Sequence, residues 1–77
     1  MEPRPIRVAL VEDDKEIREL LRSGLERAPR LQVVQSFANA EDFLVAFPLL
    51  EVDVVLMDIN LPGKSGIDCI REAKPLR

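Results

Sequence analysis

Residues 6–14 read IRVALVEDD, and this stretch decides the fold. Its first six residues are apolar apart from Arg7 and are rich in β-branched side chains, which predicts a short strand buried on both faces. Three acids follow directly: Glu12, Asp13 and Asp14. The strand is therefore expected in the interior of a sheet, with acids at its carboxyl end.

The next segments alternate between helical and strand patterns. Apolar residues recur at helical spacing over residues 17–28, which predicts an amphipathic helix that ends near Pro29. Residues 31–35 (LQVVQ) indicate an edge strand, because polar residues interrupt the apolar ones. Residues 52–57 (VDVVLM) form a second strongly apolar strand that ends at Asp58.

Capping residues predict two shorter helices. Asn39 is expected to begin a helix that runs through Phe47, where Pro48 stops it. Ser65 is expected to begin another helix, after a loop at residues 59–64 (INLPGK) with Pro-Gly turn chemistry. The apolar residues expected to face the core on the first and last helices are Ile17, Leu20, Leu21, Ile67 and Ile70.

The predicted element order is β-α-β-α-β-α, which indicates an α/β fold with a parallel sheet. Right-handed crossovers restrict the topology. The less apolar second strand belongs at an edge, and the other two belong side by side, so the expected spatial order is 2-1-3. The length of 77 residues allows one small domain.

Composition narrows the function classes. The net charge is -3 without a long Lys/Arg cluster, so direct nucleic-acid binding by this segment is not expected. The apolar runs are far shorter than the roughly 20 residues that a membrane span needs, and no signal peptide is evident. Without histidine, there are no His metal sites or His triads. A single cysteine, Cys69, fits a reducing cytoplasm.

The acids at the two apolar strand ends are expected to meet. In open parallel sheets, sites form beyond the carboxyl ends of the strands, where the winding changes direction. That point carries Glu12, Asp13 and Asp58. Two carboxylates about 4 Å apart repel by roughly 4 kcal/mol at an effective dielectric near 20, so such a cluster takes up protons or holds a cation. Mg²⁺ suits these ligands, and beside it Asp58 could act as a nucleophile toward phosphorus.

Each of these residues also has an ordinary structural interpretation. Asp13, with Glu16 three residues later, could cap the first helix. Asp58 could simply begin a turn. The position of the acids on two neighbouring strands favours a site over these alternatives. Asn60 could be only a turn residue. Lys64 is expected to be a solvated loop charge, and Cys69 a helix packing residue.

Two blocks of sequence resemble a known family. Residues 8–14 (VALVEDD) are similar to the first strand and acidic pair of receiver domains from two-component response regulators. Residues 54–66 (VVLMDINLPGKSG) are similar to their phosphorylation loop. The resemblance implies a flavodoxin-like fold in which Asp58 accepts a phosphoryl group from a sensor histidine kinase. It implies Mg²⁺ binding by the side chains of Asp13 and Asp58, by the backbone carbonyl of Asn60, and by Glu12 through water.

The resemblance also implies a context. A cytoplasmic, non-enzymatic regulator is expected, with its output in the full-length protein. Residues 62–70 (PGKSGIDCI) are most similar to regulators with a C-terminal helix-turn-helix of the NarL type, which implies control of transcription.

The chain departs from the family at its far end. The family has two further βα units, which carry a Ser or Thr and a Lys that touch the phosphoryl group. Residues 1–77 are thus expected to be the N-terminal part of a receiver domain. The third strand would then have an open edge and invite pairing, so the segment is expected to dimerise, swap elements with another copy, or belong to a longer protein.

Two other functions remain open. The first is a non-phosphorylated fragment that acts as a dimerisation or interaction module through the third strand. The second is a phosphatase of the haloacid dehalogenase type, which places a second aspartate two positions after its nucleophile. Asn60 occupies that position here, and the expected threonine is missing, which argues against this enzyme.

Overall fold

Strands and helices alternate along the chain as predicted. The structure, a computed structural model, describes residues 4–59, 61, 63 and 65–76. The elements are β1 (Ile6–Val11), α1 (Lys15–Glu26), β2 (Leu31–Phe37), α2 (Ala40–Ala46), β3 (Val54–Met57) and α3 (Gly66–Ala73), with 3₁₀ turns η1 (Phe47–Leu49) and η2 (Lys74–Leu76). Among the described residues, no helix has the length and apolar composition needed to cross a membrane.

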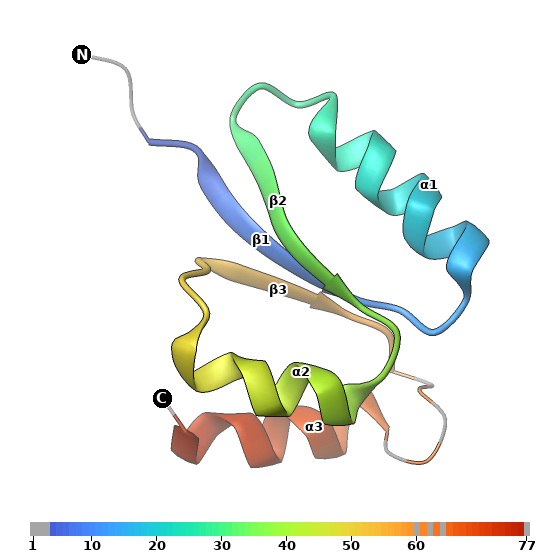
Figure 1. Ribbon diagram of the computed structural model, residues 1–77, viewed down its shortest axis with the longest axis vertical. Coiled ribbons are helices and arrows are strands. Elements are labelled where there is room, and N and C mark those ends of the chain that lie inside the picture. Colours follow the sequence, from blue (N-terminus) through green and yellow to red (C-terminus); the bar gives the residue numbers. More distant parts are fainter. Residues whose placement is uncertain (1–3, 60, 62, 64, 77) are drawn as a thin grey trace.

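The sheet is parallel, with β1 between β2 and β3, which confirms the predicted order 2-1-3 (Figure 1). β1 has the predicted bounds, and Val8 to Val11 are almost completely buried. β2 continues two residues beyond its predicted end at Gln35, to Phe37. Its pairing with β1 shifts register between Val8 and Ala9.

β3 begins at Val54 rather than at the predicted Val52. The carboxylate of Asp53 accepts a hydrogen bond from the backbone N–H of Arg7 at 2.9 Å. If β3 were longer, one of its backbone carbonyls would accept from that N–H. The Asp53 side chain takes this place, so the pairing of β3 with β1 begins only after Asp53.

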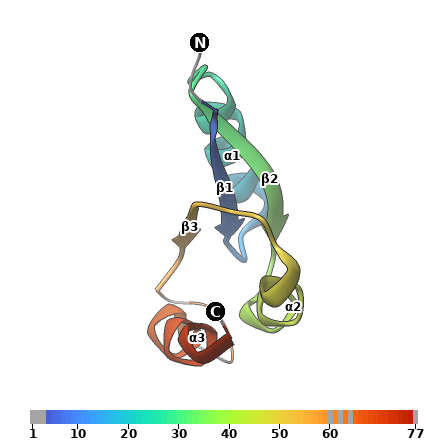
Figure 2. The same cartoon turned by 90° about the vertical axis from the view of Figure 1, so that its left-hand side faces the viewer.

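The helices form a layer on each face of the sheet. α1 lies on one face, while α2 and α3 lie beside each other across the opposite face (Figures 1 and 2). The main core lies on the α2 and α3 side, where the rings of Phe37 and Phe43 pack edge to face with centroids 5.6 Å apart. Its buried members are Ala9, Val11, Phe37, Ala40, Phe43, Leu61, Cys69 and Ala73.

The prediction that Ile17, Leu20 and Leu21 lie in the core is wrong. α1 has no buried residue, and these three side chains are between 41% and 72% exposed. α1 packs mainly over β2 rather than over β1 and β3. Its apolar stripe therefore covers only one edge of the sheet and stays open on its other side.

The predicted inward face of α3 is also wrong. Ile67 and Ile70 are 53% and 46% exposed, while Gly66, Cys69 and Ala73 are buried. The backbone N–H of Gly66 donates to the carbonyl of Ile59 at 2.8 Å. This contact holds the glycine side of the helix against the chain after β3, and the isoleucines turn outward as a result. The burial of Cys69 confirms its interpretation as a packing residue.

Both predicted helix caps are confirmed. The Asn39 side chain accepts from the N–H of Asp42 at 2.7 Å, and the Ser65 hydroxyl accepts from the N–H of Asp68 at 3.1 Å. α2 ends one residue before the predicted Phe47, and Pro48 lies inside η1. A proline at the start of a 3₁₀ turn needs no N–H partner, so it ends the α-helix without leaving a bond unmade.

Candidate functional site

The register of the sheet brings the acidic strand ends together. Val11 of β1 pairs with Met57 of β3. The next residue on each strand is therefore an acid, Glu12 on one and Asp58 on the other. The backbone N–H of Asp58 donates to the carbonyl of Val11 at 3.0 Å, which holds the start of its loop against β1.

Three carboxylates meet at this edge of the sheet. One oxygen from each of Glu12, Asp13 and Asp58 lies within 4.8 Å of the others. Residues more than forty positions apart in the sequence thus share one small volume. Asn60, the fourth residue expected at the site, lies outside the described residues, as does Lys64.

Glu12 is the most enclosed of the three acids, with 9% of its surface exposed. Its carboxylate accepts a hydrogen bond from the N–H of Asp14 at 3.1 Å, and this bond alone would lower the pKa of Glu12. Burial, a hydrogen bond with Asp13 and the charges of Asp58 and Asp13 outweigh it, so the pKa of Glu12 lies above its ordinary value. The cluster favours a positive partner for this reason.

The helix cap in this loop is Asp14 rather than Asp13. The side chain of Asp14 accepts from the N–H of Ile17 at 3.1 Å, which satisfies the first turn of α1. The proposed cap by Asp13 with Glu16 is therefore wrong. Asp13 is instead exposed beside Glu12 and Asp58.

Sequence reasoning missed Arg18. Its guanidinium donates to the carbonyl oxygens of Glu12 at 2.8 Å and of Asp13 at 3.4 Å. It thus ties the backbone of the acidic loop to α1. Arg18 lies one helical turn after the Asp14 cap, and this spacing could have indicated that its side chain reaches back to the acidic loop.

Gly66 supports the site from the far side of the loop. A Cβ atom at this position would overlap the backbone oxygen of Asp58 and lie 2.9 Å from the Cα of Ile59. Only glycine permits α3 to begin so close to the Asp58 backbone. The first turn of α3 therefore helps to set where Asp58 lies.

The three carboxylates form a group that could hold a divalent cation. Clustered carboxylate oxygens are the ligands that hard divalent cations take, and Mg²⁺ is held through one or two carboxylates with waters and phosphate oxygens. Asp58 lies among them on the loop after β3, with its backbone fixed from both sides. The donor set fits Mg²⁺ and leaves a carboxylate available as a nucleophile.

Fold and site together define an α/β protein with an acidic pocket at the switch point of a parallel sheet. The family of the response regulator receiver domain matches residues 8–76, and the chain belongs to that family. This match confirms the resemblance found in the two sequence blocks.

Curated relatives include proteins of different overall activity. A protein-glutamate methylesterase/protein-glutamine glutaminase from Paramagnetospirillum magneticum is 37% identical over 65 residues, which cover 84% of this chain and 18% of that protein. The probable C4-dicarboxylate response regulator DctR from Halalkalibacterium halodurans is 32% identical, over 90% of this chain and 30% of that protein. The chain spans about a fifth of the length of the first curated relatives.

Solved receiver structures superpose closely. The response regulator domain of Thermotoga maritima CheB matches with a TM-score of 0.86 and 28% identity, over 94% of this chain and 54% of that one. A LuxR-family two-component response regulator from an Aurantimonas species matches with a TM-score of 0.87 and 34% identity, over 92% and 51%. The chain thus corresponds to about half of each matched structure.

Proposed function

We propose that the chain is a phospho-accepting receiver in which Asp58 takes a phosphoryl group from a sensor histidine kinase, with Mg²⁺ at the acid cluster. The observation that carries this proposal is the meeting of Glu12, Asp13 and Asp58 within 4.8 Å at the ends of neighbouring strands. Membership of the receiver family supports it.

Four residues would hold the metal. Asp13 and Asp58 would bind it through their side chains, Asn60 through its backbone carbonyl, and Glu12 through water. When bound, Mg²⁺ supplies the positive charge that offsets repulsion between these carboxylates and an incoming phosphoryl group. Arg18 holds the acidic loop in place through the carbonyls of Glu12 and Asp13.

Asp58 would perform the chemistry. A carboxylate oxygen of Asp58 attacks the phosphorus atom, the bond between phosphorus and the donor's leaving atom breaks, and that atom departs with the bonding electrons. The product is an acyl phosphate on Asp58. The Asp58 backbone is held by Val11 and by the close approach of Gly66, which supports a nucleophile whose position would be restricted before the phosphoryl donor arrives.

We propose that the chain is part of a longer protein, in which a further domain would carry the regulated activity. We propose a cytoplasmic regulator whose output controls transcription, which the likeness to the LuxR-family regulator supports. The receiver segment itself would act as a regulated switch rather than as an enzyme. The methylesterase relatives name the competing output, and a continued coding sequence with a helix-turn-helix would separate the two.

Mass spectrometry after incubation with acetyl phosphate and Mg²⁺ tests the phosphorylation site. We expect one phosphoryl adduct on the peptide that contains Asp58, and no adduct in Asp58→Asn. Asp68→Asn removes an exposed aspartate of α3 outside the cluster and should label as the wild type does. An adduct that survives in Asp58→Asn contradicts the proposal.

A second candidate function is an interaction module that forms a homodimer. The observation that favours it is β3, which has β1 as its one neighbour in the described sheet. Val54 and Leu56 on this strand are 42% and 38% exposed. Exposed apolar edge strands pair with other chains.

Sedimentation tests this second candidate directly. We expect the wild type to sediment increasingly as a dimer with rising concentration, and Leu56→Lys to stay monomeric because a charge on the edge strand blocks pairing. Val45→Lys replaces an exposed apolar residue on α2 and serves as the matched control. A wild type that remains monomeric over the whole range excludes the dimer.

A further inference from the structure

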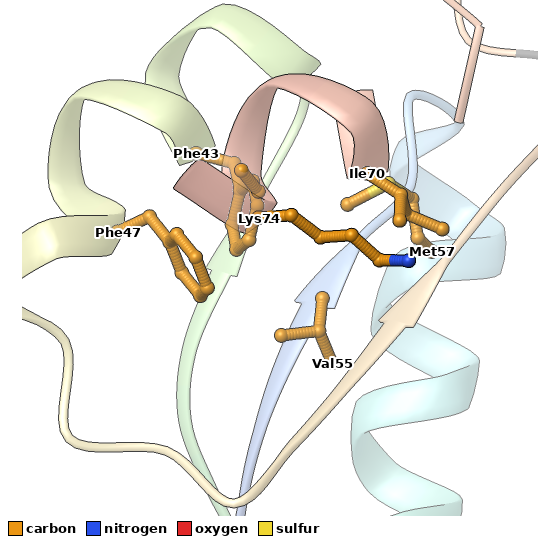
Figure 3. Close-up of a pocket in the computed structure, with 7 residues that line it drawn as sticks. Phe43, Phe47, Val55, Met57, Ile70 and Lys74 are labelled. Atoms are coloured by element: carbon orange, nitrogen blue, oxygen red, sulfur yellow. The ribbon is translucent and has the colours of Figure 1, made fainter. Parts of the chain in front are cut away.

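The two faces of the sheet support the acid cluster in different ways. On the face covered by α2 and α3, which carries the main core, apolar side chains such as Phe43, Val55 and Met57 line a cavity between these helices and β3 (Figure 3). On the other face, α1 has no buried residue. Apolar packing therefore does little to hold the acidic loop at residues 12–14 against α1, and hydrogen bonds have to do so.

Arg18 binds three consecutive carbonyl oxygens of this loop. Its guanidinium donates to the carbonyls of Glu12 at 2.8 Å and of Asp13 at 3.4 Å, and its backbone N–H donates to the carbonyl of Asp14 at 2.8 Å. Arg18 is partly buried, so water competes less for these bonds. One residue of α1 thus fixes the orientation of three successive peptide groups.

The guanidinium of Arg18 binds the backbone of the acids rather than their carboxylates. Within the part of the chain that the structure describes, it forms no ion pair with the carboxylate of Glu12 or Asp13. An arginine paired with one of these carboxylates would compete with a metal ion for its oxygen atoms. Bound to the carbonyls instead, Arg18 orients the acids without occupying the oxygen atoms that would hold a metal.

We propose that Arg18 is a positioning residue that raises the Mg²⁺ affinity of the acid cluster, because it holds Glu12 and Asp13 in place before the metal arrives. This inference rests on the proposed function, since it concerns the same metal. Without the bonds from Arg18, the loop carbonyls would turn to water and the like-charged acids would move apart. Mg²⁺ would then have to order the loop as it binds, which lowers the affinity.

The sign of the effect separates positioning from simple electrostatics. Arg18 carries a positive charge near a cation site, so removal of that charge alone should tighten Mg²⁺ binding. Loss of positioning should weaken it. Loss of a residue that orients the ligands of a metal site commonly lowers metal affinity about tenfold or more, and salt screens the opposing charge effect. We therefore expect Arg18→Met to bind Mg²⁺ about tenfold more weakly than the wild type.

Isothermal titration with MgCl₂ compares this variant with two others. Arg18→Lys keeps the charge but replaces the planar fork of donors by a single ammonium, so it should bind Mg²⁺ more tightly than Arg18→Met and more weakly than the wild type. It carries the test even if Arg18→Met does not fold. Arg22→Met removes another cation of α1, which pairs with Glu26 at 3.1 Å, and should bind Mg²⁺ as tightly as the wild type.

Two further readouts distinguish positioning from a general loss of structure. The amide of Asp14 donates to the Glu12 carboxylate at 3.1 Å. In EDTA, this amide should exchange hydrogen faster in Arg18→Met, while the amides of paired β1 and β2 exchange as in the wild type. With acetyl phosphate, the Mg²⁺ concentration for half-maximal labelling of Asp58 should rise about tenfold, and the labelling rate at saturating Mg²⁺ should stay near that of the wild type.

The outcomes separate this inference from the proposed function. If the wild type binds Mg²⁺ and Arg18→Met binds it equally or more tightly, the inference is overturned and the proposed function stands. An equal loss of affinity in Arg22→Met, or faster exchange throughout the sheet of Arg18→Met, would also overturn the inference alone. A wild type that binds no Mg²⁺ would overturn the proposed function, and this inference with it.

Discussion

Asp13 and Asp14 carry the same side chain on adjacent residues but have different surroundings. Asp14 accepts from the N–H of Ile17 and caps α1. Asp13 lies with Glu12 and Asp58 in the acid cluster. The difference arises because the chain passes from β1 into α1 here, so that Asp14 serves as the N-cap of the helix while Asp13 stays at the carboxyl end of the strand.

Asparagine substitutions at these two positions should have different effects on Mg²⁺ binding. Asp13→Asn removes a charged ligand and should weaken Mg²⁺ about tenfold or more, as losses around metal sites commonly do. Asp14→Asn keeps a good N-cap and should change the affinity little. Isothermal titration with MgCl₂ measures both, and equal affinities for the two variants would show that Asp13 is no ligand.

Two glycines offer a second comparison at the residue scale. A Cβ atom at Gly66 would collide with the Asp58 backbone, whereas a Cβ atom at Gly24 meets nothing within 4 Å. Gly66→Ala should destabilise the fold by about 1–3 kcal/mol through overpacking and reduce phosphorylation of Asp58. Gly24→Ala should stabilise α1 by about 0.5–1 kcal/mol. Urea denaturation measures both changes, and a neutral Gly66→Ala would show that the loop can move away.

At the scale of elements, local signals predicted local structure well. The bounds of β1 and the caps at Asn39 and Ser65 depend on residues within a few positions of each other, so they could be read from the sequence. The convergence of Glu12, Asp13 and Asp58 followed from topology, since parallel strands end at the same edge.

Burial of helix faces could not be predicted in the same way. The apolar spacing of α1 was correctly recognised, yet Leu20 is 72% exposed because little lies across that stripe. On α3, the close approach of Gly66 to the Asp58 backbone decides which side turns inward. Both outcomes depend on neighbours distant in the sequence, which helical periodicity does not contain.

The strand end near Asp53 gives a pH prediction. The backbone N–H of Arg7, and then its side chain, hydrogen-bond the carboxylate and hold the pKa of Asp53 below its ordinary value. A carboxyl with a lowered folded pKa contributes stability above its unfolded pKa, about 3.9, and loses that contribution as pH falls through the folded value.

Asp53→Asn should therefore be less stable than the wild type at pH 7, and the difference should shrink as the pH is lowered below about 4. Thermal unfolding at a series of pH values measures it. Glu51→Gln removes a more exposed acid that touches the same arginine and should show a smaller effect. A difference between wild type and Asp53→Asn that does not vary with pH would contradict the role given to the Arg7 contact.

At the scale of the whole molecule, the chain is small for its fold. A domain of this length buries only about 60% of its unfolded surface, and the described sheet leaves the outer edge of β3 open. The matched receiver structures are about twice as long as the region that this chain covers. Ligand binding should therefore contribute a large share of the stability.

Metal addition and removal test that expectation. Mg²⁺ at about one hundred times its dissociation constant should add about 2.7 kcal/mol, which raises the melting temperature by roughly 4–8 °C per kcal/mol in a domain of this size. EDTA should remove the gain, and Asp13→Asn should show little of it. A melting temperature that does not respond to Mg²⁺ in the wild type would argue against a metal at the acid cluster.

The most direct measurement of the central claim is the Mg²⁺ dependence of phosphorylation at a single residue. Acetyl phosphate would be incubated with the chain in Mg²⁺ or in EDTA, and the peptides compared by mass. The account predicts a phosphoryl group on the peptide that contains Asp58 in Mg²⁺ and little or none in EDTA. A phosphoryl group on another residue, or equal labelling of Asp58 in both solutions, would contradict it.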